Sequence, residues 1–250
     1  MQSIGPVNAL YPTPTTLVGA LVKGKPNFIT IAHIGIMTLD HISLGIHKSH
    51  YTNAGIKANK VFSVCLPSED LMVETDYCGI MTGKKTDKAA IFDVFYGDLA
   101  KAPMIRECPV CMECRLERIV DFAEHDVFVG QVVQTHADPA VLTDGQVDIA
   151  KVKPLLFDMA SKRYWALGAS LGNCWGEGKK LKKKLDKLEG QLSTEKLLPE
   201  IDQDLFCTIE ENNNVVELTE KGLRLIYGGH AEEYIVPDLD EELQKIEEDE

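Results

Sequence analysis

At 250 residues the chain is long enough to bury a substantial core, and its formal net charge of −13 argues against the basic surface that nucleic-acid phosphates require. No apolar run approaches the roughly twenty residues of a membrane span. The N-terminus, MQSIGPVNAL, lacks the basic and apolar regions of a signal peptide. We therefore expect a cytoplasmic protein that binds neither nucleic acid nor a membrane.

The order of apolar runs and turn residues predicts a mainly β main domain. Strands are expected over residues 15–22, 27–32, 41–46, 61–65, 113–120, 126–136 and 163–170, where β-branched and aromatic residues gather or polarity alternates. Short helices are expected over residues 53–58, with Thr52 as N-cap, and over 68–75, with Ser68 as cap. Many strands, few helices and frequent Gly and Pro favour an antiparallel barrel over a doubly wound sheet.

The acidic charge is concentrated at the end of the chain. Residues 1–178 carry 16 Lys and Arg against 19 Asp and Glu, a net of −3, whereas residues 179–250 carry 10 against 20, a net of −10. This change predicts a domain boundary near Gly178. The main domain is expected over residues 1–178 and an acidic appendage over 179–250.

The appendage is expected to be α+β. Leucines 181, 185, 188 and 192 form one helical stripe over residues 179–192. Strands are expected over residues 205–209 and 215–218, and a second helix over 220–227. Because the leucine stripe must be buried against something, we expect the appendage to pack on the barrel or on a partner subunit.

A phosphate site is the first functional hypothesis. If Thr52 caps the helix that follows the polar loop at residues 47–51, the next backbone N–H groups point outward and suit a phosphate. Ser49 adds a hydroxyl group, and Lys48 and His50 add polar or positive side chains. The alternative is an ordinary capped helix on the surface, and this stretch alone does not separate the two.

The seven cysteines fit a reducing compartment, because an odd, scattered set is no disulfide framework. Cys108, Cys111 and Cys114 have a spacing at which thiolates bind zinc or an iron–sulfur cluster. No fourth ligand stands at a recognisable distance, and residues 111–120 roughly alternate like a half-buried strand. We therefore favour strand cysteines without a metal and keep a metal site as the alternative.

No side-chain catalytic machinery is evident in the sequence. No G-x-G-x-x-G or G-K-[ST] motif follows a predicted strand, and the G-x-S-x-G pattern at residues 168–172 is not followed directly by a predicted helix, as a nucleophile elbow would be. His41, His47 and His136 are interpreted as ordinary strand or loop residues. Rossmann, P-loop and serine-hydrolase functions are therefore not predicted.

A series of short motifs points to one family. They are Gly24-Lys25-Pro26-Asn27, Ser49-His50-Tyr51-Thr52, Phe62-Ser63-Val64-Cys65-Leu66-Pro67, Thr82-Gly83-Lys84-Lys85-Thr86-Asp87-Lys88, Glu107-Cys108-Pro109, His125-Asp126-Val127-Phe128-Val129-Gly130, and Tyr164 with Leu167-Gly168. In this order and spacing, residues from about 12 to 178 resemble the flavin reductase-like, FMN-binding split-barrel family, and within it the flavoredoxins. The resemblance implies an antiparallel split β-barrel of Greek-key type.

The resemblance also implies a set of FMN-binding residues and a homodimer with FMN at or near the subunit interface. The residues that would lie at the isoalloxazine ring are Asn27, Thr30, Ala32 and His33. The phosphate would be held by Ser49, His50, Tyr51 and Thr52, and Lys88 would add positive charge. His125 would lie near the flavin, and Tyr164 would form an aromatic wall. His33 stands where relatives often have Trp, and His50 where Arg is common. No catalytic side chain is implied, because the flavin carries the chemistry.

Two hypotheses follow. The first is an FMN-binding flavoprotein that takes electrons from a reduced nicotinamide, NAD(P)H, or a protein donor and passes them through FMN to an acceptor. The second is a non-catalytic binding module with a metal site at Cys108, Cys111 and Cys114 and an acidic docking tail. A flavin absorption spectrum supports the first hypothesis, and a colourless protein with stoichiometric zinc supports the second.

Overall fold

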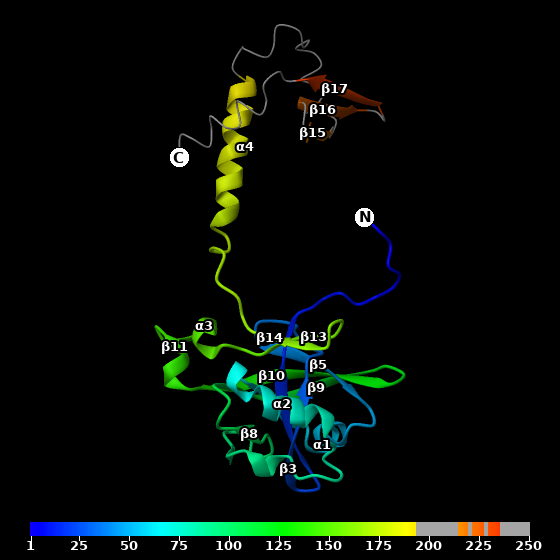
Figure 1. Ribbon diagram of the computed structural model, residues 1–250, viewed down its shortest axis with the longest axis vertical. Helices are drawn as coiled ribbons and strands as arrows, with labels where there is room; N and C mark the ends of the chain where they lie inside the picture. Colours follow the sequence, from blue (N-terminus) through cyan, green and yellow to red (C-terminus); the bar gives the residue numbers. More distant parts are fainter. Residues whose placement is uncertain (194–214, 220–221, 228–229, 236–250) are drawn as a thin grey trace. The chain divides into compact units, whose positions relative to one another are not determined.

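The computed structural model describes residues 1–193, 215–219, 222–227 and 230–235. The chain divides into two compact units, Met1–Ala169 and Ser170–Glu250, which can be followed by colour in Figure 1. The division falls close to the change of charge at Gly178. The assignment of residues 1–178 and 179–250 as functional domains stays a prediction.

The first unit is built on a seven-stranded antiparallel sheet. Its strands are, in spatial order, β3 (Lys25–Ile31), β2 (Thr16–Val22), β6 (Val61–Leu66), β9 (Val110–Asp121), β10 (His125–Ala137), β5 (His41–His47) and β4 (Ile34–Ile36). Although β3 and β5 are far apart in this order, they contact each other, so the sheet curls into half of a barrel. The expected mainly β, antiparallel barrel architecture is confirmed.

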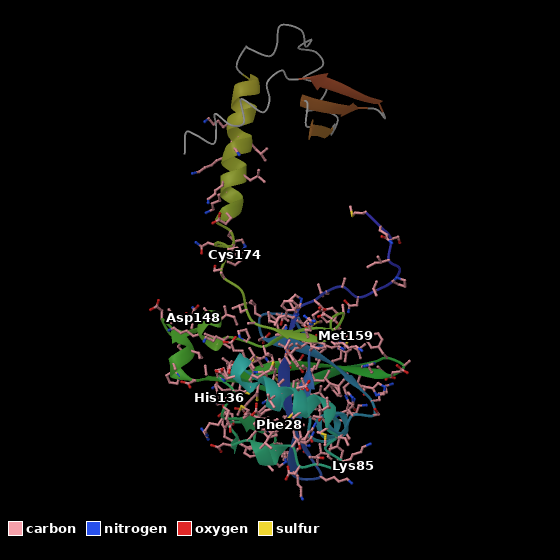
Figure 2. The ribbon with its side chains drawn as sticks, viewed as in Figure 1. Phe28, Lys85, His136, Asp148, Met159 and Cys174 are labelled. Atoms are coloured by element: carbon pink, nitrogen blue, oxygen red, sulfur yellow. The ribbon has the colours of Figure 1, made fainter. Side chains whose placement is uncertain are left out.

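Both faces of this sheet are covered, because neighbouring residues on a strand enter different core clusters. On β2, Leu17 packs in one cluster and Val18 in the other. On β3, Phe28 and Ile29 divide in the same way, and Phe28, labelled in Figure 2, is fully buried. This follows from the two-residue period of a strand. The sheet therefore has two apolar faces rather than one.

Two short helices pack against the sheet. Helix α1 (Tyr51–Asn59) lies on β2, and its close approach requires Gly55, where an added Cβ would stand 2.5 Å from the Leu21 carbonyl oxygen. The segment predicted as a helix over 68–75 is instead the 3-10 turn η1 (Glu69–Leu71) followed by α2 (Met72–Ile80), which lies on β3. Ser68 flanks η1 without a side-chain capping bond. The helix therefore extends beyond its predicted end.

A small three-stranded sheet brings the end of this unit back to its beginning. Strand β1 (Thr13–Pro14) pairs with β13 (Leu156–Asp158), which pairs with β14 (Arg163–Trp165). The predicted strand over 163–170 therefore ends early, at Trp165. The remaining elements are η2 (Ala89–Ile91), β7 (Val94–Phe95), β8 (Met104–Ile105), η3 (Pro139–Val141), β11 (Leu142–Thr143), β12 (Gln146–Val147) and α3 (Ile149–Val152).

The second unit contains α4 (Glu177–Ser193) and the antiparallel sheet β15 (Val215–Thr219), β16 (Gly222–Tyr227) and β17 (His230–Ile235). The helix predicted over 179–192 and the strand over 215–218 are confirmed. The helix predicted over 220–227 is wrong, because its described residues form β16, which pairs with strands on both sides. The strand predicted over 205–209 and the acidic end, 238–250, lie outside the described residues.

None of the helices in the described part of the chain has the length and apolarity that a membrane crossing requires.

Candidate functional site

A pocket of about 270 Å³ lies where β3, β5, β10 and β14 meet the start of α1 and the end of α2. Its apolar lining includes Ile31, Phe157 and Met159. Of the residues expected at the cofactor, six line it: Thr30, Ala32, His33, His50, His125 and Tyr164. The chain thus brings together side chains that are far apart in the sequence, and among the lining residues that the sequence analysis did not select, His47 and Thr15 have polar side chains.

Three imidazole rings form one side of the pocket. His47 ends β5 and is the register partner of His125 on β10, with the ring centroids 5.0 Å apart and the rings edge to face. The ring of His50, in the loop before α1, lies 5.7 Å from that of His47. The interpretation of His47 as an ordinary strand residue missed this contact, since the pairing of β5 with β10 is not visible locally in the sequence.

The start of α1 differs from the prediction. His50, not Thr52, is the N-cap, and its side chain makes no capping bond. Thr52 therefore sits in the first turn, only 1% exposed, where its hydroxyl accepts a 2.6 Å hydrogen bond from Nδ2 of Asn27. The first-turn N–H groups of α1 have no side-chain cap, so this helix start keeps the character of an anion site.

The other expected residues surround this helix start without lining the pocket. Ser49 is exposed and tied to His47, whose Nδ1 lies 2.8 Å from the Ser49 hydroxyl. Tyr51 and Asn27 both face Gly83, where an added Cβ would stand 2.8 Å from the Tyr51 ring and would overlap Oδ1 of Asn27. The loop that contains Gly83 is therefore packed directly over Asn27 and Tyr51.

Lys88 brings a buried positive charge close to His50. Its Nζ donates to the carbonyl oxygens of Cys78 at 2.9 Å and Met81 at 3.1 Å, at the end of α2. An ammonium has three N–H donors, so one is not used by these two acceptors. Burial lowers the pKa of Lys88. The pKa of His50 is also lowered, first by burial and then by His47, Lys88 and His125.

Hydrogen bonds between neighbouring elements hold the walls of this pocket in place. Tyr164 donates to Asp76 of α2 at 2.9 Å, and burial together with Asp76 raises its pKa. Asp126, next to His125, accepts from Asn53 at 2.7 Å and pairs with Lys57 at 2.6 Å, which anchors α1 to β10. Burial alone would raise the pKa of Asp126, and the bonds from Lys57 and Asn53 outweigh it and lower the pKa.

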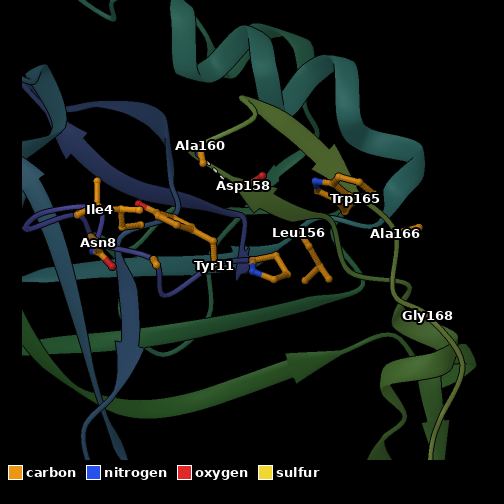
Figure 3. Close-up of a pocket in the computed structure, with 12 residues that line it drawn as sticks. Ile4, Asn8, Tyr11, Leu156, Asp158, Ala160, Trp165, Ala166 and Gly168 are labelled. Carbon is orange, nitrogen blue, oxygen red and sulfur yellow. Dashed lines mark hydrogen bonds between the residues drawn. The ribbon is translucent and has the colours of Figure 1, made fainter. Parts of the chain in front are cut away.

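A larger pocket of about 630 Å³ lies between the N-terminal segment and the strands β13 and β14, with Ile4, Tyr11, Leu156 and Trp165 among its lining residues (Figure 3). None of the expected site residues lines it. Asp158, its acidic side chain, accepts from the backbone N–H of Ala160 at 2.9 Å. Tyr11 links the two pockets, because its Oη lies 3.3 Å from Nε2 of His33. The smaller pocket, not this one, gathers the polar groups.

The cysteines behave as core residues of strands. Cys111 and Cys114 lie three residues apart on β9, which places them on opposite faces of the sheet and in different core clusters. Cys65 on β6 is the register partner of Cys111 and shares its cluster with Cys108, just before β9. A single ion bound by Cys108, Cys111 and Cys114 does not fit this arrangement. No metal-binding group of His, Cys, Asp or Glu occurs among the described residues.

Fold and site together define a class: a split-barrel protein with a polar, imidazole-lined pocket beside the start of α1. The chain belongs to the flavin reductase like domain family, whose model matches residues 8–165. It is similar to two solved structures, the flavoredoxin from Methanosarcina acetivorans (38% identity, TM-score 0.69, 72% of this chain and 98% of that one) and the flavoredoxin of Desulfovibrio vulgaris (Miyazaki F) (30% identity, TM-score 0.67, 71% and 99%).

A protein of undefined function from Archaeoglobus fulgidus is 31% identical over 145 residues, which cover 56% of this chain and 80% of that protein. All of these similarities are to the family domain or to chains about as long as the first unit. The resemblance inferred from the motifs is therefore confirmed at the level of the family.

Proposed function

We propose that the protein binds FMN in the 270 Å³ pocket and is an oxidoreductase that passes electrons from a reduced nicotinamide or a protein donor through FMN to an acceptor. The observation that carries the proposal is the convergence on this pocket of six residues that the family resemblance assigned to FMN. The family membership and the similarity to two flavoredoxins support it.

The donor set of the pocket suits the two ends of FMN. At one end, the uncapped start of α1 and the His50 side chain suit a phosphate dianion, and the buried Lys88 lies near His50. At the other end, Ala32, Phe157, Met159 and Tyr164 give apolar and aromatic surface for a flat ring. The hydroxyl of Thr15 is buried and has no partner among the described residues, so a polar ring edge would satisfy it.

The residues of this chain would bind and orient rather than react. When bound, FMN supplies the one- and two-electron chemistry. His33, His125 and Tyr164 would flank the ring, and Asn27 and Thr30 would fix the floor beneath it. Thr30 already donates to the Thr75 carbonyl oxygen, which holds α2 against β3. The Tyr164–Asp76 bond likewise keeps the aromatic wall in place.

One chain encloses only part of such a cofactor. The pocket is slightly smaller than the range of about 300–1,000 Å³ usual for small-molecule sites. We therefore also propose a homodimer in which the partner subunit covers the open side, and residues 179–250 as an appendage of this flavin domain.

The test is titration of the purified protein with FMN, followed by flavin fluorescence and visible absorption. We expect saturable 1:1 binding per chain, with reduction of the bound flavin by NADH, NADPH or a reduced ferredoxin-type donor. Substitution His125→Ala should weaken FMN binding, whereas His41→Ala, on β5 and outside the pocket lining, should not. A wild-type protein that neither quenches nor retains FMN would refute the proposal.

A further inference from the structure

Contacts with Ser49 orient the His47 ring. Its Nδ1 accepts a 3.1 Å hydrogen bond from the backbone N–H of Ser49. A backbone N–H only donates, so Nδ1 carries no proton, and the neutral ring must carry its proton on Nε2. The geometry thus assigns the tautomer of the neutral ring, with Nδ1 as acceptor and Nε2–H as donor.

The second ring nitrogen of His47 is left for a ligand. Nε2 has no hydrogen-bond partner among the described residues, and the half-buried ring lines the 270 Å³ pocket. The rings of His50 and His125 flank it at centroid distances of 5.7 and 5.0 Å. An N–H donor with a fixed tautomer therefore stands between two titratable imidazoles.

The charges around these rings favour an anion. Lys88 lies near His50, and His33 and Tyr164 complete the ionisable lining of the pocket, which contains no Asp or Glu among the described residues. Three nearby carboxylates already have partners: Asp126 pairs with Lys57, Asp121 pairs with Lys48 at 2.5 Å, and Asp76 accepts from the Tyr164 hydroxyl. A ligand anion entering here meets imidazole and hydroxyl groups, and no carboxylate is among the described lining residues.

We propose that His47 is an additional phosphate-positioning residue, whose Nε2–H donates to the phosphate dianion of FMN while His50 takes up a proton as the ligand binds. This inference rests on the proposed function, because it concerns the same flavin. A proton on Nδ1 of His47 would face the Ser49 N–H. The proton therefore goes to His50, which lies next to His47 at the start of α1.

The sign of the pH effect follows from linkage. Before the ligand binds, the pKa of His50 lies below its usual value of 6.5, so the ring is neutral at pH 7. A dianion raises that pKa in the complex. Between the two pKa values, affinity falls by about tenfold per pH unit as pH rises, because each binding event needs a proton from solution. Ionisation of the phosphate itself, near pH 6, acts in the opposite direction.

The experiment compares FMN with riboflavin, which lacks the phosphate, on the full-length protein between pH 6.5 and 8.5. His47→Asn keeps an acceptor near Nδ1 and removes the Nε2 donor, whereas His47→Gln places an amide donor near Nε2. We expect His47→Asn to weaken FMN about tenfold and riboflavin less than twofold, with partial recovery in His47→Gln. His41→Asn, on the same strand and outside the pocket lining, is the matched control and should change neither ligand.

For the wild type, FMN affinity should fall with rising pH while riboflavin affinity stays level. Calorimetry in two buffers of different ionisation enthalpy should show net proton uptake with FMN only. Equal losses for both flavins in His47→Asn, or an FMN affinity that does not fall with pH, would overturn the inference and leave flavin binding standing. Failure of the wild type to bind either flavin would overturn the proposed function itself.

Discussion

Asn27 on β3 and Thr52 in the first turn of α1 are joined by a 2.6 Å hydrogen bond between two side chains that are both at least 96% buried. The bond crosses from the sheet to the helix start at the edge of the pocket. A buried amide without a partner is costly, so the position of Asn27 depends on the Thr52 hydroxyl. The helix start and the floor of the site are therefore fixed together.

Thr52→Val should destabilise the protein by about 1–3 kcal/mol, because it leaves the Asn27 amide without its acceptor. Thr52→Ser keeps the hydroxyl and should cost less. We expect Val to weaken FMN and riboflavin to a similar extent, since Asn27 is displaced for both. Urea unfolding and flavin titration measure the two effects. A loss confined to FMN would instead indicate that Thr52 acts on the phosphate directly.

Thr15 and Thr13 provide a second matched pair. Both hydroxyls are buried and have no partner in the described part of the chain, and only Thr15 lines the 270 Å³ pocket. Each Thr→Val change should therefore stabilise the flavin-free protein, by about 1 kcal/mol, because an unsatisfied polar group is removed.

Only Thr15→Val should weaken flavin binding, and by the same factor for FMN and riboflavin, because the contact is to the ring. Thermal unfolding without flavin and titration with both ligands give the two readouts. Unchanged flavin affinity in Thr15→Val would remove Thr15 from the site.

The barrel strands could be predicted because their signals are local. Strands β9 and β10 carry long runs with partial alternation and β-branched residues, and both were expected close to their observed bounds. The segment 222–227 shows the limit. Apolar side chains recur there at every second position, at Leu223, Leu225 and Tyr227, but Thr219 resembled a helix cap and led to the helix prediction. The segment forms a strand because it pairs with β15 on one side and β17 on the other.

The site depended on contacts that no local pattern contains. Thr52 was the best capping residue in its neighbourhood, but its hydroxyl is engaged by Asn27, 25 positions away, and the helix begins before it. His47 became a site residue only through its register with His125. Family motifs identified six lining residues, whereas the orphan hydroxyl of Thr15 required the packed structure.

Asp126 should make stability depend on pH. Its folded pKa lies below the usual 3.8, so the stabilisation is present above about pH 4 and is lost as pH falls through the folded pKa. Asp126→Asn should flatten the fall in unfolding free energy between pH 5 and 3. Asp121→Asn is the control. Asp121 on β9 is the register partner of Asp126 on β10, but its side chain is 76% exposed in its ion pair with Lys48, and an exposed ion pair contributes little to stability. If the unfolding free energy fell equally steeply with falling pH in the wild type, Asp126→Asn and Asp121→Asn, the assignment of this pH dependence to Asp126 would be wrong.

The cysteines give a test of the strand interpretation. Cys111→Ser retains an acceptor, the Ile105 carbonyl oxygen, which lies 3.3 Å from Sγ. Cys114 has no hydrogen-bond partner among the described residues, so Cys114→Ser should cost more, about 1–3 kcal/mol. Chelators should leave the melting temperature of the wild type unchanged. Stoichiometric zinc, lost together with the fold on chelation, would restore the metal hypothesis.

The final prediction concerns residues 179–250. The family match ends at residue 165 and the first compact unit at Ala169, and the buried core clusters of the described residues contain no member beyond Val152. A fragment of residues 1–178 should therefore fold and still bind FMN. The fragment 179–250 has a net charge of −10. Ordering its backbone costs about 1–2 kcal/mol per residue, so we expect it not to fold alone.

Removal of residues 179–250 should appear as a weaker dimer or a lower melting temperature, because the leucine stripe of α4 needs a surface to cover it. Sedimentation of the 1–178 fragment and of the full chain over a range of concentrations measures the first effect, and thermal unfolding the second. Cooperative unfolding of the isolated 179–250 fragment, with dimerisation and melting of 1–178 unchanged, would show instead that the appendage is an independent domain.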